Sequence, residues 1–235
     1  MHNEDELTFG TVPISTPTRD RAKKFTFTDD QTKAYNGLIK FINEPYNPKD
    51  FKRALIGPGG TGKTFLLKAL LQDCNIPFSE IGLSAPSHKA CRVLKNSIRG
   101  THCNVNTIQS DFGFKPNYDI EKFDINNVTF ASYGRIKIED YRLYIVDESS
   151  MLNRSLVNYI DKMMKKSSIK LLICGDDAQI PPVNEKDSYA FKGVKSFRLT
   201  EIVRQDEDNP IRELTELLRN DVYNGTFNFL NYISN

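Results

Sequence analysis

The chain has 235 residues, of which 39% are hydrophobic, 11% aromatic and 26% charged, as expected of one large globular domain or two small ones. Its 32 basic and 30 acidic residues leave a net charge of only +2. That balance excludes a protein held on nucleic acid by bulk charge alone, although a local basic groove would still suffice for binding.

Cysteine spacing and hydropathy bear on metal binding and on the cellular location of the protein. The cysteines Cys74, Cys91, Cys103 and Cys174 are too far apart in sequence to form the close ligand pairs of zinc ribbons and fingers. No stretch approaches the roughly 20 consecutive apolar residues of a membrane span. The acidic N-terminus also lacks the apolar core of a signal peptide. We therefore expect a soluble, cytoplasmic protein with reduced cysteines and no membrane partner.

Strands and helices are expected to alternate along most of the chain. Residues 1–24 lack periodicity and are expected to form a flexible N-terminal arm. Short apolar runs then predict strands, and apolar residues at helical spacing predict helices. The strands are expected at 53–56, 81–85, 143–146 and 169–174, and the helices at 30–42, 63–72, 88–96 and 155–165. This alternation predicts an α/β fold: a parallel sheet with helices on both faces.

The stretch 111–140 interrupts the alternation. It carries six aromatic residues among Asn, Asp, Lys and Pro, and it is longer than most connections in compact domains. We interpret it as a small inserted subdomain that projects from the sheet. Its aromatic residues would either act on a ligand or form a small core of their own.

The strongest motif is the run Gly57-Pro58-Gly59-Gly60-Thr61-Gly62-Lys63-Thr64, which lies between a predicted strand and a predicted helix. Glycines let successive backbone N–H groups turn toward phosphates, and the following helix N-terminus favours an anion. Lys63 would reach the β- and γ-phosphates, and the Thr64 hydroxyl would bind Mg²⁺. The run predicts an ATP site that requires Mg²⁺.

Two more strand ends carry polar groups suited to the same reaction. Asp147 and Glu148 follow the strand 143–146, where Asp147 would hold Mg²⁺ and Glu148 would orient or deprotonate the attacking water. Gln179 follows the strand 169–174, and its amide can donate to a γ-phosphate. Taken alone, each is also consistent with an ordinary cap or turn.

The order of these motifs resembles superfamily 1 DNA helicases, most of all the 5′→3′ branch that contains RecD and Dda. The matching segments are G-P-G-G-T-G-K-T, A-P-S-H-K-A at 85–90, D-E-S-S-M, G-D-D-A-Q-I-P-P-V at 175–183 and L-T-E-I-V-R-Q at 199–205. The resemblance covers about residues 25–220 and implies a RecA-like motor domain. It also implies single-stranded and forked duplex DNA as partners, roles in DNA replication, recombination or repair, and association with the nucleoid of a bacterial or phage-infected cell.

The resemblance assigns further roles. Gln31 matches the glutamine that reads adenine, and Arg204 matches an arginine that contacts the γ-phosphate. The family's single-strand DNA contacts match two segments: Pro86, Ser87, His88 and Lys89 in the first, and Thr107, Ile108 and Gln109 in the second. The family usually has histidine where Gln109 stands, so a contact there would be uncharged. The insertion 111–140 occupies the place of the family's strand-separating pin.

Superfamily 1 helicases have two RecA-like domains, and the second is not found here. Residues 221–235 are too few for a domain, so we expect a C-terminal tail toward a missing second motor domain. The isolated chain is accordingly expected to be poorly active. Two alternatives stay open: a P-loop ATPase that is not a helicase, and a non-catalytic module that binds nucleotide or DNA.

Overall fold

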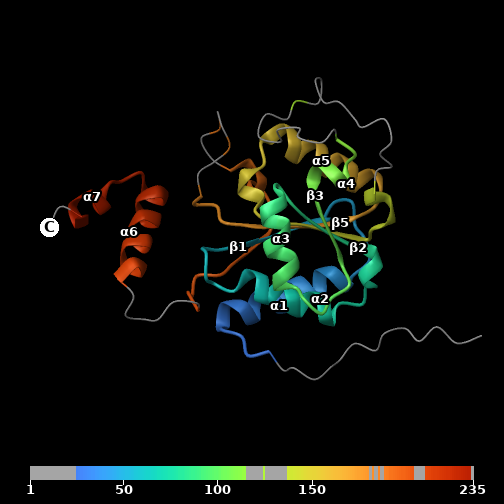
Figure 1. Ribbon diagram of the computed structural model, residues 1–235, viewed down its shortest axis with the longest axis horizontal. Coiled ribbons are helices and arrows are strands. Elements are labelled where there is room, and N and C mark those ends of the chain that lie inside the picture. Colours follow the sequence, from blue (N-terminus) through green and yellow to red (C-terminus); the bar gives the residue numbers. More distant parts are fainter. Residues whose placement is uncertain are drawn as a thin grey trace, which may run out of the picture.

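The computed structural model describes residues 25–114, 124, 137–179, 182, 185, 188–203 and 210–233. The expected N-terminal arm and most of the expected insertion lie outside these residues. Figure 1 shows a central sheet with helices packed on its two faces, and a final pair of helices beside it.

All six strands belong to one sheet, in the order β3-β2-β4-β5-β1-β6, and every neighbouring pair is parallel. The strands are β1 Lys52–Ile56, β2 Ile81–Ala85, β3 Asn104–Thr107, β4 Leu143–Val146, β5 Lys170–Gly175 and β6 Ser196–Arg198. The four predicted strands are confirmed to within one residue at each end. The sequence did not predict β3 and β6, because each is short and contains a single apolar residue.

The helices are α1 Asp29–Asn43, α2 Lys63–Asp73, α3 His88–Ser97, α4 Ile108–Asp111, α5 Arg154–Lys166, α6 Pro210–Asn224 and α7 Asn228–Ile233. Helices α1, α2 and α3 contribute to the hydrophobic cluster on one face of the sheet, and α4 and α5 to the cluster on the other. The predicted α/β architecture is therefore confirmed. Residues 221–235, expected to be a C-terminal tail, contain the end of α6 and all of α7.

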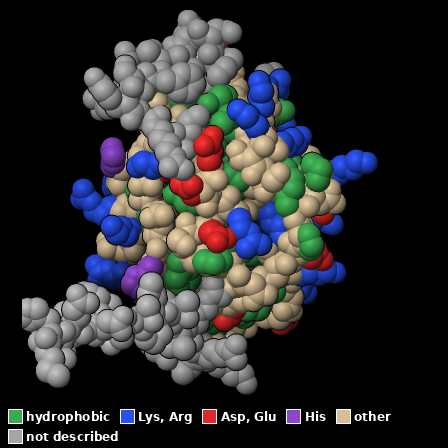
Figure 2. Space-filling model, turned by 90° about the vertical axis from the view of Figure 1, so that its right-hand side faces the viewer, with side chains coloured by type: hydrophobic (Ala, Val, Ile, Leu, Met, Phe, Trp, Pro, Cys, Tyr) green, Lys and Arg blue, Asp and Glu red, His purple; other side chains and the backbone are tan. Residues whose placement is uncertain are grey.

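The surface carries charges of both signs. Figure 2 shows one face of the molecule, on which Lys and Arg side chains lie mostly toward the rim and several acidic side chains lie near the middle. No helix in the described part of the chain is both long and apolar enough to cross a bilayer.

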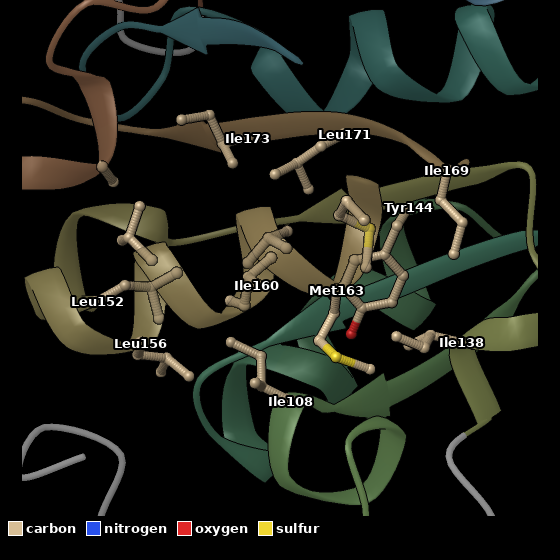
Figure 3. Close-up of a cluster of buried hydrophobic side chains, with 14 of the residues drawn as sticks. Ile108, Ile138, Tyr144, Leu152, Leu156, Ile160, Met163, Ile169, Leu171 and Ile173 are labelled. Carbon is tan, nitrogen blue, oxygen red and sulfur yellow. The ribbon is translucent and has the colours of Figure 1, made fainter. Parts of the chain in front are cut away.

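Alternating side chains of the strands build two cores, one on each face. In β4, Leu143 and Ile145 face the cluster under α1 and α2, whereas Tyr144 and Val146 face the cluster under α5. Figure 3 shows the Tyr144 ring within the second cluster, beside Ile138 and Met163.

Two aromatics that the sequence assigned to a projecting insertion belong to this main core. Phe112 and Phe114 are 0% and 3% exposed, and both rings pack against Tyr159 of α5. These two rings therefore do not project from the sheet. The remaining aromatics of that stretch lie outside the described residues.

A buried lysine fixes the end of α1 to the sheet. Lys170 of β5 is 4% exposed, and its ammonium donates to the carbonyl oxygens of Phe41 at 2.7 Å, Ile42 at 2.9 Å and Glu44. The last carbonyls of a helix lack partners within the helix, so the lysine satisfies groups that would otherwise be buried unpaired. Burial lowers the pKa of Lys170, and the nearby Glu44 carboxylate opposes that shift.

Lys170→Met should lower the free energy of unfolding by roughly 1–3 kcal/mol, because the buried carbonyls lose their donor. Urea denaturation followed by circular dichroism would measure the loss. The control Lys166→Met alters an exposed lysine of α5 and should change stability by less than about 0.5 kcal/mol. Equal losses in the two variants would contradict the anchoring role of Lys170.

Candidate nucleotide and DNA site

The glycine-rich run forms the turn between β1 and α2, as its sequence predicts. The Lys63 ammonium donates to the carbonyl oxygens of Gly57 at 2.7 Å and Pro58 at 2.9 Å. The Thr61 hydroxyl donates to the same Pro58 carbonyl at 2.9 Å. The loop thus folds around the lysine, whose present partners are weak acceptors compared with a phosphate oxygen.

Gln31 ties α1 to this loop. Its side-chain NH₂ donates to the Thr61 carbonyl at 3.0 Å, and its side-chain oxygen accepts from the Thr28 backbone N–H in a capping box. Gly62 has φ of 82°, and a Cβ there would lie only 2.6 Å from Gln31 Nε2. In this structure both ends of the Gln31 amide are used within the protein, and its role in reading adenine stays a prediction.

The predicted acid pair follows β4 directly. Burial and the neighbouring Glu148 carboxylate raise the pKa of Asp147, while the Lys63 charge acts to lower it. Glu148 adopts the left-handed conformation, with φ of 53° and ψ of 37°, which is uncommon outside glycine. Such a backbone conformation at the end of a buried strand is typical of functional turns.

Gln179 lies next to the acid pair in space. The Ser150 hydroxyl donates to Gln179 Oε1 at 2.7 Å, which leaves the exposed amide NH₂ of Gln179 to donate to a phosphate. Ser150 belongs to the turn Ser149–Met151 that begins directly after Glu148. The structure therefore brings three predicted groups, Lys63, Asp147 with Glu148, and Gln179, to one edge of the sheet.

Two further groups at this edge were not predicted from the sequence. Asp176, which directly follows β5, is 5% exposed and accepts from Arg219 of α6 at 2.9 and 2.5 Å. Asp177 accepts from Arg198 and from the Tyr223 hydroxyl. The two aspartates were visible in the sequence, but nothing in it marked Arg219 or Tyr223 as their partners. Arg204 lies outside the described residues, so its predicted contact stays a prediction.

The residues predicted to contact DNA differ in their exposure to solvent. Ser87, His88 and Lys89 are exposed at the N-terminus of α3, whereas Pro86 is buried. Thr107 is 5% exposed, and its hydroxyl caps α4 by accepting from the Ser110 backbone N–H at 3.2 Å. Ile108 is 0% exposed and belongs to the core, so its side chain is not available to DNA. Gln109 is half-buried on α4.

A buried polar network supports α4. Asp111 is 0% exposed, and its carboxylate accepts from the Tyr144 hydroxyl and from Asn106 Nδ2, each at 2.9 Å. Burial raises the pKa of Asp111 to about 6, although both hydrogen bonds and the Lys137 charge act to lower it. Two of its members, Asn106 and Asp111, flank the segment 107–109 that is expected to contact DNA. Sequence alone did not single out Asp111, because its partners come from β3 and β4.

Residues suited to a hard cation lie beside Lys63. The Thr64 hydroxyl and the Asp147 carboxylate are oxygen donors of the type that Mg²⁺ prefers. The burial that raises the pKa of Asp147 also makes a nearby cation favourable. Among the described residues, no group of three or more His, Cys, Asp or Glu side chains could hold a metal ion. Thr64 and Asp147 supply two oxygen donors, which fit an ion that takes its other ligands from a nucleotide and water.

A parallel sheet with a glycine-rich phosphate loop after β1 and an acid pair after β4 defines a RecA-like P-loop NTPase. A family model described as an AAA domain matches residues 40–232, and the chain belongs to this family. An uncharacterised protein of Acanthamoeba polyphaga mimivirus is 27% identical over 217 residues, which cover 83% of this chain and 42% of that protein. The Pif1 ATP-dependent DNA helicase of a Psychrobacter strain is 25% identical over 150 residues, which cover 58% of this chain and 21% of that helicase.

Solved structures show the same fold. A structure of Pif1 helicase from Bacteroides, in complex with ADP-AlF3 and single-stranded DNA, superposes with a TM-score of 0.54 at 22% identity and covers 84% of this chain. These matches confirm the predicted resemblance to the motor domains of superfamily 1 helicases, and the proteins matched are Pif1 helicases. The chain spans less than half the length of each of the three proteins.

The network around Asp111 should make stability depend on pH. The pKa of Asp111 is about 6 in the folded chain against an ordinary value of 3.8, so the folded state holds the proton between these values. The free energy of unfolding therefore falls as pH rises through this window. Asp111→Asn removes the titration, and its stability relative to the wild type should rise by about 2 kcal/mol from pH 4 to pH 6. Parallel pH profiles in urea denaturation would contradict the raised pKa.

Proposed function

We propose that this chain is the ATP-hydrolysing motor part of a DNA helicase, which couples MgATP hydrolysis to 5′→3′ movement on single-stranded DNA and to separation of forked duplexes. The observation that carries the proposal is the gathering of Lys63, Glu148 and Gln179 at the edge that also exposes Ser87, His88 and Lys89. The resemblance to Pif1 helicases supports the choice of substrate, and the polarity rests on the resemblance to RecD and Dda.

Each group at the nucleotide site has a defined task in this proposal. Lys63 leaves the Gly57 and Pro58 carbonyls and takes the β- and γ-phosphates as stronger partners. Thr64 and Asp147 would hold Mg²⁺, which supplies positive charge to the phosphates when bound. Glu148 accepts a proton from the water that attacks the γ-phosphorus, and the bond to the β–γ bridging oxygen breaks. Gln179 donates its amide to the γ-phosphate, and Arg204 adds a second cation there.

DNA would cross the same edge of the sheet. Ser87 is exposed, and its hydroxyl, which accepts from the Ala90 N–H at 3.2 Å, can still donate to a phosphate oxygen. The ammonium of Lys89 also suits a phosphate oxygen, and Gln109 adds an uncharged hydrogen-bonding group. Contacts of this kind do not depend on the base, as a translocating motor requires. A second RecA-like domain, contributed by the rest of the helicase, would complete the ATP site and the DNA groove.

Lys63→Ala should abolish ATP hydrolysis, because the variant loses the charge that balances the β- and γ-phosphates. Single-turnover hydrolysis, with the chain in excess over radiolabelled ATP, would detect even slow activity, and single-stranded DNA should stimulate the wild type. The control Lys68→Ala alters another lysine of α2, outside the loop. Hydrolysis by Lys63→Ala at the wild-type rate would contradict the phosphate site. Hydrolysis without DNA stimulation would favour an ATPase that is not a helicase.

Glu148→Gln should separate binding from chemistry. The amide keeps the shape of the side chain but cannot accept the proton, so turnover should fall by at least about 10²-fold while MgATP still binds. Calorimetric titration and single-turnover hydrolysis would measure the two quantities. If binding and turnover fell by the same factor, Glu148 would be a metal ligand, not the base. A wild type that binds MgATP without turnover would favour a non-catalytic module.

A further inference from the structure

Side chains of α6 bind two adjacent aspartates in the turn that carries Gln179. Arg219 donates two hydrogen bonds to Asp176, and the ion pair is largely shielded, with side-chain exposures of 22% and 7%. One turn of helix further on, the Tyr223 hydroxyl donates to Asp177 at 2.7 Å. Planar, two-bonded contacts between a guanidinium and a carboxylate fix orientation as well as distance.

The second aspartate also connects the turn to β6. Arg198 donates to Asp177 through both of its terminal nitrogens and to the Tyr223 hydroxyl at 2.8 Å. Burial acts to raise the pKa of Asp177, but the hydrogen bonds from Arg198 and Tyr223 lower it overall. The carboxylate is therefore held in its charged form by groups from two separate elements.

These contacts of α6 lie next to the phosphate loop. A cavity of about 470 Å³ opens between the loop and α6, with Pro58 and Gly59 of the loop on one side and Glu216 and Arg219 of α6 on the other. The chain between β6 and α6 also touches the loop, because the Val203 backbone N–H donates to the Gly60 carbonyl at 3.0 Å. Movement of α6 would therefore change the cavity beside the loop and the turn that carries Gln179.

Hydrogen bonds within the turn connect Asp176 to Gln179. Asp176 accepts from the backbone N–H of Ala178 through its side chain at 3.1 Å, and from that of Gln179 through its carbonyl at 3.2 Å. Removal of Arg219 would leave the buried Asp176 carboxylate without its positively charged partner, which is strongly unfavourable, so the turn would rearrange. Gln179 would then lose the position fixed by its bond to Ser150.

We propose that Arg219 is a positioning residue that couples α6 to the γ-phosphate end of the nucleotide site, so that the site distinguishes ATP from ADP only while α6 is docked. This inference rests on the proposed function. By linkage, ATP binding should tighten the docking of α6 by the same factor by which docked α6 favours ATP.

The test compares two affinities in the full chain: that for a non-hydrolysable ATP analogue and that for ADP, both with Mg²⁺, by calorimetric titration. Arg219→Ala and Asp176→Asn should each lower the preference for the ATP analogue by at least about threefold, with ADP affinity little changed. The double variant should lose no more than either single variant, because both remove one interaction. Arg219→Lys keeps the charge and should restore part of the preference.

Arg142→Ala is the matched control, because it breaks an exposed ion pair with Glu80, at 3.3 Å, at the amino end of β4. Hydrogen exchange of α6 in each variant would show whether the helix has detached. An unchanged ATP preference in Arg219→Ala with α6 detached would overturn the inference, as would a wild type that binds the two nucleotides equally. A wild type that binds neither nucleotide would instead overturn the proposed function.

Discussion

The pairing of β1 with β5 is the constraint on which the site depends. The two strands run parallel in a register that places Ile56 opposite Gly175, and the Gly57 backbone N–H continues the ladder by donating to the Gly175 carbonyl at 3.1 Å. The phosphate loop and the turn that carries Gln179 therefore leave the sheet side by side. β4 pairs with β5 on its other side, which brings the acid pair to the same edge. Parallel strands give this arrangement because all their carboxyl ends meet at one edge.

The aspartates at this edge have two different electrostatic environments. Burial raises the pKa of Asp147 and Asp111, since few positive groups lie near enough to stabilise their charge. Asp177 is also partly buried, but its hydrogen bonds to Arg198 and Tyr223 lower its pKa. Asp147 is suited to accept a cation, whereas Asp111, which accepts from Tyr144 and Asn106, and Asp177 hold elements together. A raised pKa alone therefore does not separate a group suited to chemistry from one that maintains the structure.

Much of this arrangement could be predicted from sequence, because short patterns of consecutive residues indicate it. The strands β1, β2, β4 and β5 are continuous apolar runs, and Gly57–Thr64 is a motif whose spacing is fixed by phosphate geometry. The same reasoning could not find β6, where only Phe197 is apolar, or the network of Asp111 with Asn106 and Tyr144. Those contacts join residues up to 33 positions apart, and no short-range pattern records such a pairing.

The core position of Phe112 and Phe114 illustrates a second limit of prediction from sequence. Aromatic residues in an irregular stretch are equally consistent with a projecting subdomain and with a loop folded back on the main core. Tyr159 of α5 decides between them for these two rings, because it offers an aromatic surface on that face of the sheet. Composition does not contain that information, since it depends on where a helix 45 residues later in the chain is packed.

Lys63 connects the electrostatics of the site to nucleotide binding. Its charge acts to lower the pKa of Asp147 while its ammonium is bound to the loop carbonyls of Gly57 and Pro58. A nucleotide that draws Lys63 to its phosphates brings negative charge toward the same buried carboxylate. Asp147 must then gain either a proton or another cation, because an uncompensated buried charge is costly. Where Asp147 is ionised, the nucleotide is therefore expected to bind more tightly together with a divalent cation than without one.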